Sequence, residues 1–424
     1  MIRTEPVRGM KDYVGIEAKE IRFLEDVFRK TVELSNYIEV ISPIIEEFSL
    51  FAMKGGEELR RTMYTFKDKA ERELSLRPEI TPSIARVFLD KLQPLPRPIK
   101  LYYIGTVYRY DEPQNGRYRE FRQAGVEVLG AEGPLVDTLV INDLYTFFNK
   151  IGMGNIITIK LNNISIIRRI LEDMGINEGE QEHILHLIDK GLFDDAVQEI
   201  DRLATSDKKN METMFEIIKA GTISEVKLKD YISYYKNLSQ QFIYLKQVYE
   251  MSKNLGIPVK LDMSLVRGLA YYTGIIFEVK TENVQFSIAG GGRYDRLIEI
   301  YGGPHTPAVG FAVGIERTLI AGKGYIKISQ LPKIIIFNLT SSCLMFSISL
   351  AGKLRENGYI TEIDTKGGSL GKAIPSYISQ GFRLMIIIGE KEVREGNVTV
   401  KDLDKKTQVT VAVDKLLDLL KQML

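Results

Sequence analysis

The sequence has few of the residues that cross-link a chain or bind metal ions. Its 424 residues include one cysteine, Cys343, and three histidines, His183, His186 and His305. A single cysteine excludes an intramolecular disulfide, and so few histidines leave a zinc site of the Cys/His type without enough ligands. We therefore expect a protein of a reducing, cytoplasmic compartment.

Long apolar runs are also missing. The first residues, MIRTEPVRGMKD, lack the apolar core of a signal peptide, and no run approaches the ~18 apolar residues that a membrane span needs. Neither sign of charge is in excess, since 57 Lys and Arg residues balance 56 Asp and Glu residues. That balance neither requires nor excludes a nucleic-acid partner, because binding depends on a local basic surface. We expect a soluble protein that does not span a membrane.

The chain is too long for one ordinary core, and its periodicity divides it into segments. Residues 1–163 begin with an amphipathic helix pattern and continue with strand-like runs, which predicts a sheet flanked by helices. Residues 164–245 consist of helix-period segments, several closed by glycine, which indicates a helical insertion. Strand-like runs return in residues 246–325, and residues 330–424 alternate strand and helix signals, which is typical of a separate α/β domain.

The stretch VYRYDEPQNGRYREFRQAGVEVLG, residues 107–130, concentrates arginines, carboxylates and aromatic residues around a PQNG turn. Alternate residues of a strand share one face, so a paired hairpin would gather a guanidinium fork, an aromatic plate and hydrogen-bond acceptors. Taken alone, the pattern fits a solvated hairpin with cross-strand ion pairs more simply than a ligand site. The side chains expected to share faces are Arg109 and Asp111 before the turn, and Arg119, Phe121, Gln123 and Glu127 after it.

Other stretches carry related chemistry. In LSLRPEITP, Glu79 and Thr81 are two residues apart, so on a strand both would face one ammonium group. LVRGLAYYTG places Arg267 ahead of a tyrosine pair. AGGGRYDRL contains a glycine run that fits either a turn or close approach of a ligand to the backbone. AVGFAVGIERTLI predicts a strand that turns into a helix and brings Gly310, Gly314 and Arg317 to the junction.

Together these stretches resemble the histidyl-tRNA synthetase family, which belongs to the class II aminoacyl-tRNA synthetases. The resemblance runs from RGMKDY near the start to LRENGYITEID and IIIGEKEVREGNVTVKDL near the end. It implies an α+β fold, with an antiparallel catalytic sheet, a helical insertion and a C-terminal α/β anticodon-binding domain. It also implies that Pro43 ends class II motif 1, that the hairpin is motif 2 and that VGFAVGIER is motif 3. Since motif 1 typically builds a two-fold interface, the resemblance implies a homodimer.

The resemblance implies activation of L-histidine by ATP with Mg²⁺, then transfer of the histidyl group to the 3′ end of tRNA-His. No dedicated protein site for a metal is expected. The residues at the family's motif positions fall into three groups. The catalytic residues would be Arg109, Arg267 and Arg317. ATP would contact Arg109, Asp111, Arg117, Phe121 and Arg317. Histidine would contact Glu79, Thr81, Arg109, Gln123, Glu127, Arg267, Tyr271, Tyr272 and Tyr294.

Two other interpretations compete with this one. A non-aminoacylating regulatory paralogue, such as the histidine-sensing subunit of ATP phosphoribosyltransferase, usually lacks the C-terminal domain and some motif arginines, whereas this chain keeps them. A class II synthetase for threonine or proline would not carry the RGLAYYTG and AGGGRYD stretches, and a threonine enzyme needs zinc ligands. The chain departs from the family pattern at Ala270, where many relatives have aspartate, and at Glu112, where many bacterial relatives have arginine.

Overall fold

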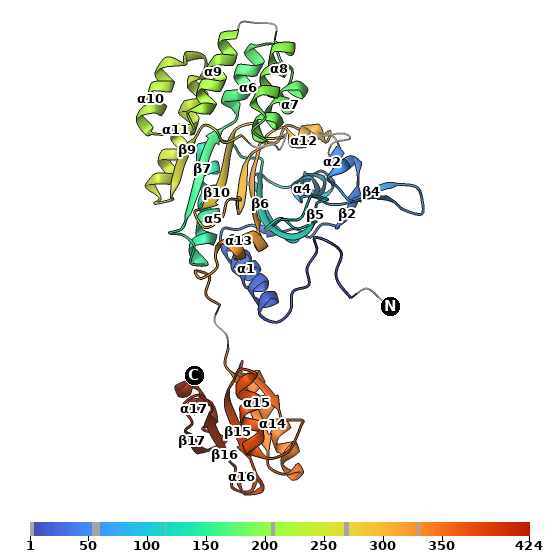
Figure 1. The fold of residues 1–424 in the computed structure, drawn as a ribbon, viewed down its shortest axis with the longest axis vertical. Helices are drawn as coiled ribbons and strands as arrows, with labels where there is room; N and C mark the ends of the chain where they lie inside the picture. The colour runs from blue at the N-terminus through green and yellow to red at the C-terminus, as the bar shows by residue number, and fades with distance from the viewer. Residues whose placement is uncertain (1–3, 53–59, 115, 205–207, 267–270, 329–330) are drawn as a thin grey trace. The chain divides into compact units, whose positions relative to one another are not determined.

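The computed structural model describes residues 4–52, 60–114, 116–204, 208–266, 271–328 and 331–424. It divides the chain into two compact units, Met1–Lys327 and Ile328–Leu424 (Figure 1). Arg267 and Ala270 lie outside the described residues. No helix in the described ranges combines the length and the apolar character that a membrane crossing requires.

The first unit is built on a large mixed sheet, which in the described part of the chain has nine strands in the order β1-β5-β6-β12-β11-β10-β7-β9-β8. Neighbours are antiparallel from β5 through β7, whereas β1 pairs with β5, and β9 with β7, in parallel. The strands are β1 Ile38–Glu39, β5 Ile99–Tyr108, β6 Glu120–Leu129, β7 Ile157–Asn163, β8 Thr222–Ile223, β9 Val259–Asp262, β10 Ile275–Thr281, β11 Ala289–Arg293 and β12 Ala308–Gly314.

Helices α1 (Ile16–Glu33) and α5 (Pro134–Lys150) cover one face of this sheet. The apolar stripe of α1 is buried, as its spacing predicts, with Phe28 fully enclosed. The Phe28 ring lies 5.4 Å from that of Phe147 on α5 and 6.1 Å from that of Phe311 on β12, both edge-on. This aromatic cluster joins helix, helix and strand, and so fixes one side of the sheet while the other side remains available for a site.

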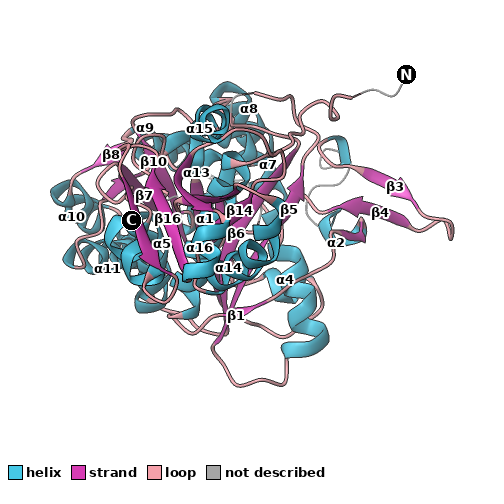
Figure 2. Cartoon of the chain, turned by 90° about the horizontal axis from the view of Figure 1, so that it is seen from below, coloured by secondary structure: helices cyan, strands magenta, loops and turns pink. Residues whose placement is uncertain are grey.

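A small sheet of β2 (Ile45–Glu47), β4 (Glu73–Leu76) and β3 (Thr65–Lys67) stands beside the large one, and β3 and β4 extend away from it (Figure 2). The expectation that Glu79 and Thr81 share a strand face is wrong. Strand β4 ends at Leu76, and Thr81 is the first residue of helix α4 (Thr81–Val87). Proline explains this change, because Pro82 lies in the first helical turn, where a missing N–H costs nothing.

Six α-helices and one short 3₁₀ helix, Lys236–Leu238, lie between β7 and β9 within the described residues, and they form a compact group at one end of the first unit (Figure 1). The group contains one very short strand, β8, which pairs with β9 at the edge of the large sheet. We call α6–α11 the helical segment. Its members are α6 Ser165–Asp173, α7 Glu178–Asp189, α8 Phe193–Leu203, α9 Lys208–Lys219, α10 Glu225–Tyr234 and α11 Ser239–Asn254.

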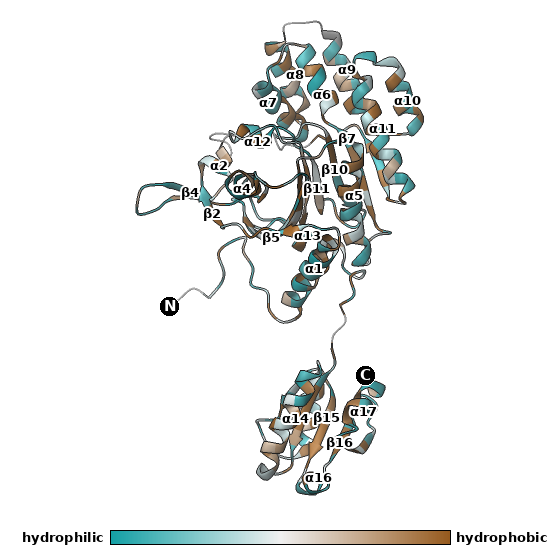
Figure 3. Ribbon diagram, turned by 180° about the vertical axis from the view of Figure 1, so that it is seen from behind, coloured by the Kyte–Doolittle hydropathy of each residue, from teal (hydrophilic) through white to brown (hydrophobic). Residues whose placement is uncertain are grey.

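The second unit has a five-stranded sheet in its described residues, in the order β14-β13-β15-β16-β17, with hydrophobic residues along the central strands (Figure 3). Apolar clusters fill both faces, and Cys343 is buried in one of them, as expected. The α/β alternation predicted for this region is confirmed. The elements are β13 Lys333–Asn338, α14 Leu344–Glu356, β14 Ile360–Ile363, α15 Leu370–Ser379, β15 Phe382–Ile388, α16 Glu390–Glu395, β16 Asn397–Asp402, β17 Gln408–Ala412 and α17 Leu416–Met423.

Candidate active site

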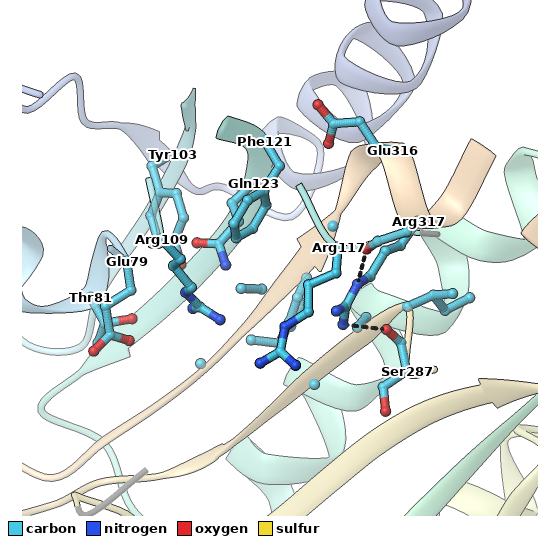
Figure 4. Close-up of a pocket in the computed structure, with 18 of the residues that line it drawn as sticks. Glu79, Thr81, Tyr103, Arg109, Arg117, Phe121, Gln123, Ser287, Glu316 and Arg317 are labelled. Atoms are coloured by element: carbon cyan, nitrogen blue, oxygen red, sulfur yellow. Dashed lines mark hydrogen bonds between the residues drawn. The ribbon is translucent and has the colours of Figure 1, made fainter. Parts of the chain in front are cut away.

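A cavity of about 290 Å³ lies over the middle strands of the large sheet. Every predicted site residue that the structure describes lines it, although these residues come from five separate stretches of sequence. They are Glu79, Thr81, Arg109, Asp111, Arg117, Phe121, Gln123, Glu127, Tyr271, Tyr272, Tyr294 and Arg317. Figure 4 shows Glu79 and Thr81 at one end of the cavity and Arg317 with Ser287 at the other.

The hairpin builds the cavity floor by strand alternation. Strands β5 and β6 pair with Val107 opposite Phe121 and Gly105 opposite Gln123, so alternate residues of β6 face the cavity. Arg119 departs from the predicted face, because it precedes β6 and packs elsewhere. Its Nε donates to the carbonyl of Asp111, and its guanidinium group lies 4.1 Å from the centre of the Tyr110 ring.

Glu127 is a buried carboxyl group in the wall of the cavity. The Thr81 hydroxyl donates to Glu127 Oε1 at 2.7 Å, and the Tyr294 hydroxyl donates to Oε2. Burial raises the pKa of Glu127 to about 8, although both hydroxyl donors act to lower it. The group is therefore neutral more often than an ordinary glutamic acid, and in either state it can pair with a ring nitrogen of a ligand.

Next to this acid, two further groups are placed to hold a cation. The Tyr271 hydroxyl donates to Glu79 Oε2 at 2.8 Å, which fixes that carboxylate at the cavity wall. Gln123 Oε1 is buried and has no hydrogen-bond partner in the described part of the chain. Because a buried carbonyl oxygen without a partner is costly, this position favours a ligand that brings an N–H donor.

Away from Glu79 the cavity becomes strongly cationic. Arg109, whose Nε donates to the carbonyl of Pro78 at 3.0 Å, lies beside Glu79, and the guanidinium groups of Arg117 and Arg317 lie together toward the other end (Figure 4). Arg317 donates from Nε to the carbonyl of Gly116 at 2.7 Å and from a terminal nitrogen to that of Ser287 at 3.1 Å. Burial lowers the pKa of Arg317, and repulsion from Arg109 and Arg117 lowers it further.

One carboxylate, Asp111, offsets this charge by accepting from Arg117 Nε at 3.0 Å. The Phe121 ring lies beside the arginines, 5.4 Å from the guanidinium carbon of Arg109. Three converging guanidinium groups with one paired carboxylate suit a polyanion, and the aromatic ring offers a stacking surface for a base.

Several lining residues were missed by sequence reasoning, among them Tyr103, Ser287 and Glu316. Tyr103 could have been found by alternation, since it shares a face of β5 with Gly105 and Val107, and Arg109 directly follows that strand. Glu316 carried no such signal. Its two carboxylate oxygens each accept the backbone N–H of Arg122 at 3.0 Å, which ties the start of α13 (Ile315–Ala321) to β6.

The described residues contain no group of three His, Cys, Asp or Glu side chains arranged to hold a metal ion. The acidic residues at the cationic end already have partners, since Asp111 accepts from Arg117 and Glu316 from Arg122. A divalent cation in this cavity would therefore have to be held mainly by its accompanying anion.

The chain is similar to known proteins over its full length. Residues 9–318 match the family model described as histidyl-tRNA synthetase, and residues 333–423 match the model described as anticodon binding domain. The chain is 47% identical to the histidine--tRNA ligase of Saccharolobus solfataricus over 431 residues, which covers 100% of both chains.

Two solved structures are also similar. The histidyl-tRNA synthetase of Nostoc sp. PCC 7120 aligns over 100% of both chains with a TM-score of 0.82 at 22% identity, which bears on the fold alone. The apo histidyl-tRNA synthetase of S. aureus aligns over 99% of both chains with a TM-score of 0.70 at 27% identity.

Proposed function

The chain belongs to the histidyl-tRNA synthetase family of class II aminoacyl-tRNA synthetases, and from that premise we propose how its cavity performs the reaction. It is a histidine--tRNA ligase, which activates L-histidine with ATP to histidyl-adenylate and then transfers the histidyl group to tRNA-His. The full-length match and the anticodon-binding domain at residues 333–423 argue against the regulatory paralogue, which usually lacks that domain. The observation that carries the proposal is the convergence of five distant stretches on one cavity with an acidic and a cationic end.

The cationic end takes ATP. Arg109 grips the α-phosphate, Arg117 and Arg317 hold the remaining phosphates, and Phe121 stacks on the adenine. Phosphoryl transfer of this kind needs little covalent help, because charge that is already in position stabilises the developing negative charge around the α-phosphate. Mg²⁺ arrives with ATP, since the nearby carboxylates of Asp111 and Glu316 are already engaged.

The acidic end takes histidine. Glu79, Thr81 and Gln123 hold the α-ammonium group, for which the unpartnered Gln123 Oε1 supplies an acceptor. Glu127 and Tyr272 contact the two imidazole nitrogens, while Tyr271 and Tyr294 fix Glu79 and Glu127 by hydrogen bonds. A side chain without ring nitrogens would leave these buried polar groups unpaired, which is the physical basis of selectivity.

Arg267 completes the site by analogy with the family, as a bridge between the histidine carboxylate and the α-phosphate. It lies outside the described residues, so this role rests on the resemblance. Removal of a preorganised charge donor typically costs on the order of 10²–10³ in rate. We expect the rate of adenylate formation to fall by the same factor in Arg267→Ala. A cytoplasmic location follows from the role in protein synthesis and is part of the proposal.

The homodimer is also proposed, with the edge of the large sheet as its interface. Among the described residues, strand β1 is the last strand at its edge of the sheet. A hollow beside it is lined by residues from within 38–47 and 86–101. Ile38, Ile41 and Leu95 on its rim are 60%, 86% and 44% exposed. An apolar rim along a free strand edge favours a second copy of the chain as its cover.

The assignment of the two ends is tested by steady-state pyrophosphate exchange on Glu127→Ala. The Michaelis constant for histidine should rise more than that for ATP, because only the amino-acid contact is lost. Glu132→Ala, an exposed glutamate five residues along, serves as the matched control and should change neither constant. A larger rise in the Michaelis constant for ATP than in that for histidine would show that Glu127 does not contact the amino acid.

A further inference from the structure

The backbone that carries Tyr272 is held by the first helix of the helical segment. Arg168 on α6 donates from Nε to the carbonyl oxygen of Tyr272 at 2.9 Å. The backbone N–H of Ile164, just before α6, donates to the carbonyl of Gly274, also at 2.9 Å. A residue that lines the histidine end of the cavity is therefore positioned by a helix that lines no part of it.

A second contact reaches the backbone of Tyr294 from the last helix of the helical segment. The Tyr244 hydroxyl on α11 donates to Asp137 Oδ2 at 2.7 Å. Asp137 on α5 is fully buried and accepts two hydrogen bonds from Arg293. Nε of Arg293 donates at 3.0 Å, and one of its terminal nitrogens donates at 2.5 Å. Arg293 directly precedes Tyr294, whose hydroxyl holds Glu127.

The two backbone stretches are joined to each other by further hydrogen bonds. The N–H of Thr273 donates to the carbonyl of Arg293 at 2.8 Å, and the N–H of Asp295 donates to Thr273 Oγ1 at 3.0 Å. The remaining terminal nitrogen of Arg293 donates to Asp295 at 2.9 Å. Displacement of either stretch therefore displaces the other.

We propose that Arg168 and Tyr244 are positioning residues for histidine recognition. They hold the joined stretches so that Tyr272 and Tyr294 meet the imidazole and Glu127 in the required geometry. The inference rests on the proposed function of this cavity and deepens it, because it adds two residues of the helical segment that touch no substrate. The ATP contacts depend less on these anchors, since Arg109, Phe121 and Arg317 lie on or beside β5, β6 and α13. In the described part of the chain, none of these elements accepts the hydrogen bond from Arg168 Nε or that from the Tyr244 hydroxyl.

The test uses the full-length chain and histidine-dependent pyrophosphate exchange. Arg168→Met removes the donor to Tyr272 and keeps much of the side-chain volume. We expect the Michaelis constant for histidine to rise about tenfold, the effect of one lost hydrogen bond in a constrained site, while that for ATP changes less than twofold. Arg168→Lys, which keeps a donor, should restore part of the affinity.

Tyr244→Phe tests the second anchor by removing a single hydroxyl group. It should raise the Michaelis constant for histidine severalfold with kcat nearly unchanged. Because Asp137 and Arg293 form a buried ion pair that is costly to break, both are left intact. Thermal melting of each variant shows that the protein assayed is folded, and if Arg168→Met does not fold, Tyr244→Phe and Arg168→Lys decide the question.

Matched controls are available on the same helices and their neighbours. Arg169→Met changes the next residue of α6, an arginine that pairs within its own helix with Glu172 at 3.2 Å and Asp173 at 3.0 Å. Tyr234→Phe changes a tyrosine that is 77% exposed on α10. Neither control substitution should alter the Michaelis constant for histidine or that for ATP.

The outcomes separate the two proposals. Wild-type protein that shows no histidine-dependent exchange would overturn the proposed function itself. The positioning role alone would be overturned if the wild type is active and the folded Arg168 and Tyr244 variants keep the wild-type Michaelis constant for histidine. The same holds if their Michaelis constants for histidine and for ATP rise together. A rise selective for histidine in the variants and absent from the controls supports it.

Discussion

Glu127 shows how one residue can combine selectivity with a cost in stability. It is 1% exposed and is held by two neutral hydroxyl donors rather than by a cation. Burial consequently raises its pKa from 4.5 to about 8. The proposed contact with the imidazole accounts for such an acid, since an apolar residue of similar size would fill the same space without the burial of a polar group.

The raised pKa of Glu127 predicts a pH dependence of stability in the ligand-free protein. Between pH 4.5 and 8 the unfolded state releases the proton while the folded state keeps it, so the free energy of unfolding falls as the pH rises. The loss should be roughly 5 kcal/mol across this range, since each pH unit between the two pKa values is worth about 1.4 kcal/mol.

Urea unfolding at several pH values, compared between wild type and Glu127→Gln, measures this effect. The amide cannot ionise, and the other titrating groups are common to both proteins, so the stability difference isolates Glu127. We expect Glu127→Gln to gain stability relative to wild type as the pH rises to about 8, and to gain no more above it. A difference that does not vary with pH would contradict the assigned pKa.

At the scale of elements, the proposed histidine end of the cavity depends on the close approach of β12 to β6. Gly310 pairs with Glu127 across these strands, and a Cβ at residue 310 would overlap Glu127 Oε2 and the carbonyl of Val126. The neighbouring Gly314 is different, because a Cβ there would meet nothing nearer than Arg317 at 3.6 Å. The two glycines of one strand therefore have different reasons to lack a side chain.

Gly310→Ala should displace Glu127 and raise the Michaelis constant for histidine on the order of tenfold or more, with a stability cost of about 1–3 kcal/mol from overpacking. Gly314→Ala on the same strand should behave like wild type in both respects. Exchange kinetics and thermal melting of the pair measure the contrast. Equal behaviour of the two variants would show that the approach of β12 to Glu127 is not the limiting feature.

Prediction from the sequence succeeded for elements with strong local signals and failed where tertiary context decides. The stripe of α1, the strand-to-helix junction at Gly314 and the alternation of the second unit are confirmed, because spacing alone specifies them. The prediction that Glu79 and Thr81 share a strand face was wrong. Both residues nevertheless line the cavity, since α4 directs Thr81 inward from a different backbone conformation.

The sequence could predict which residues line the candidate site, but not how their side chains are arranged in space. The resemblance to the family, carried by the order of its motifs, identified the lining side chains, whereas the chemistry of the hairpin alone fitted a solvated structural element more simply. Glu316 and the chain of contacts from Tyr244 through Asp137 to Arg293 carried no local signal. They depend on long-range packing of helices against the sheet, which spacing does not encode.

At the scale of the whole molecule, the free sheet edge predicts self-association. Ile41→Glu places a charge in the proposed interface, where its burial should cost roughly 3 kcal/mol and weaken the dimer by about a hundredfold. Val226→Glu, at an exposed position on α10, is the control. Light scattering behind a sizing column should give twice the chain mass for wild type and the control, and a shift toward monomer for Ile41→Glu. A monomeric wild type at micromolar concentration would contradict the dimer.

The measurement that tests the central claim most directly is exchange of pyrophosphate into ATP with Mg²⁺ and without tRNA, for each of the twenty amino acids in turn. The proposed arrangement of the cavity, with an acidic end for histidine and a cationic end for ATP, predicts exchange with histidine alone. Exchange that depends on another amino acid, or no exchange with any amino acid from folded protein, would contradict the account.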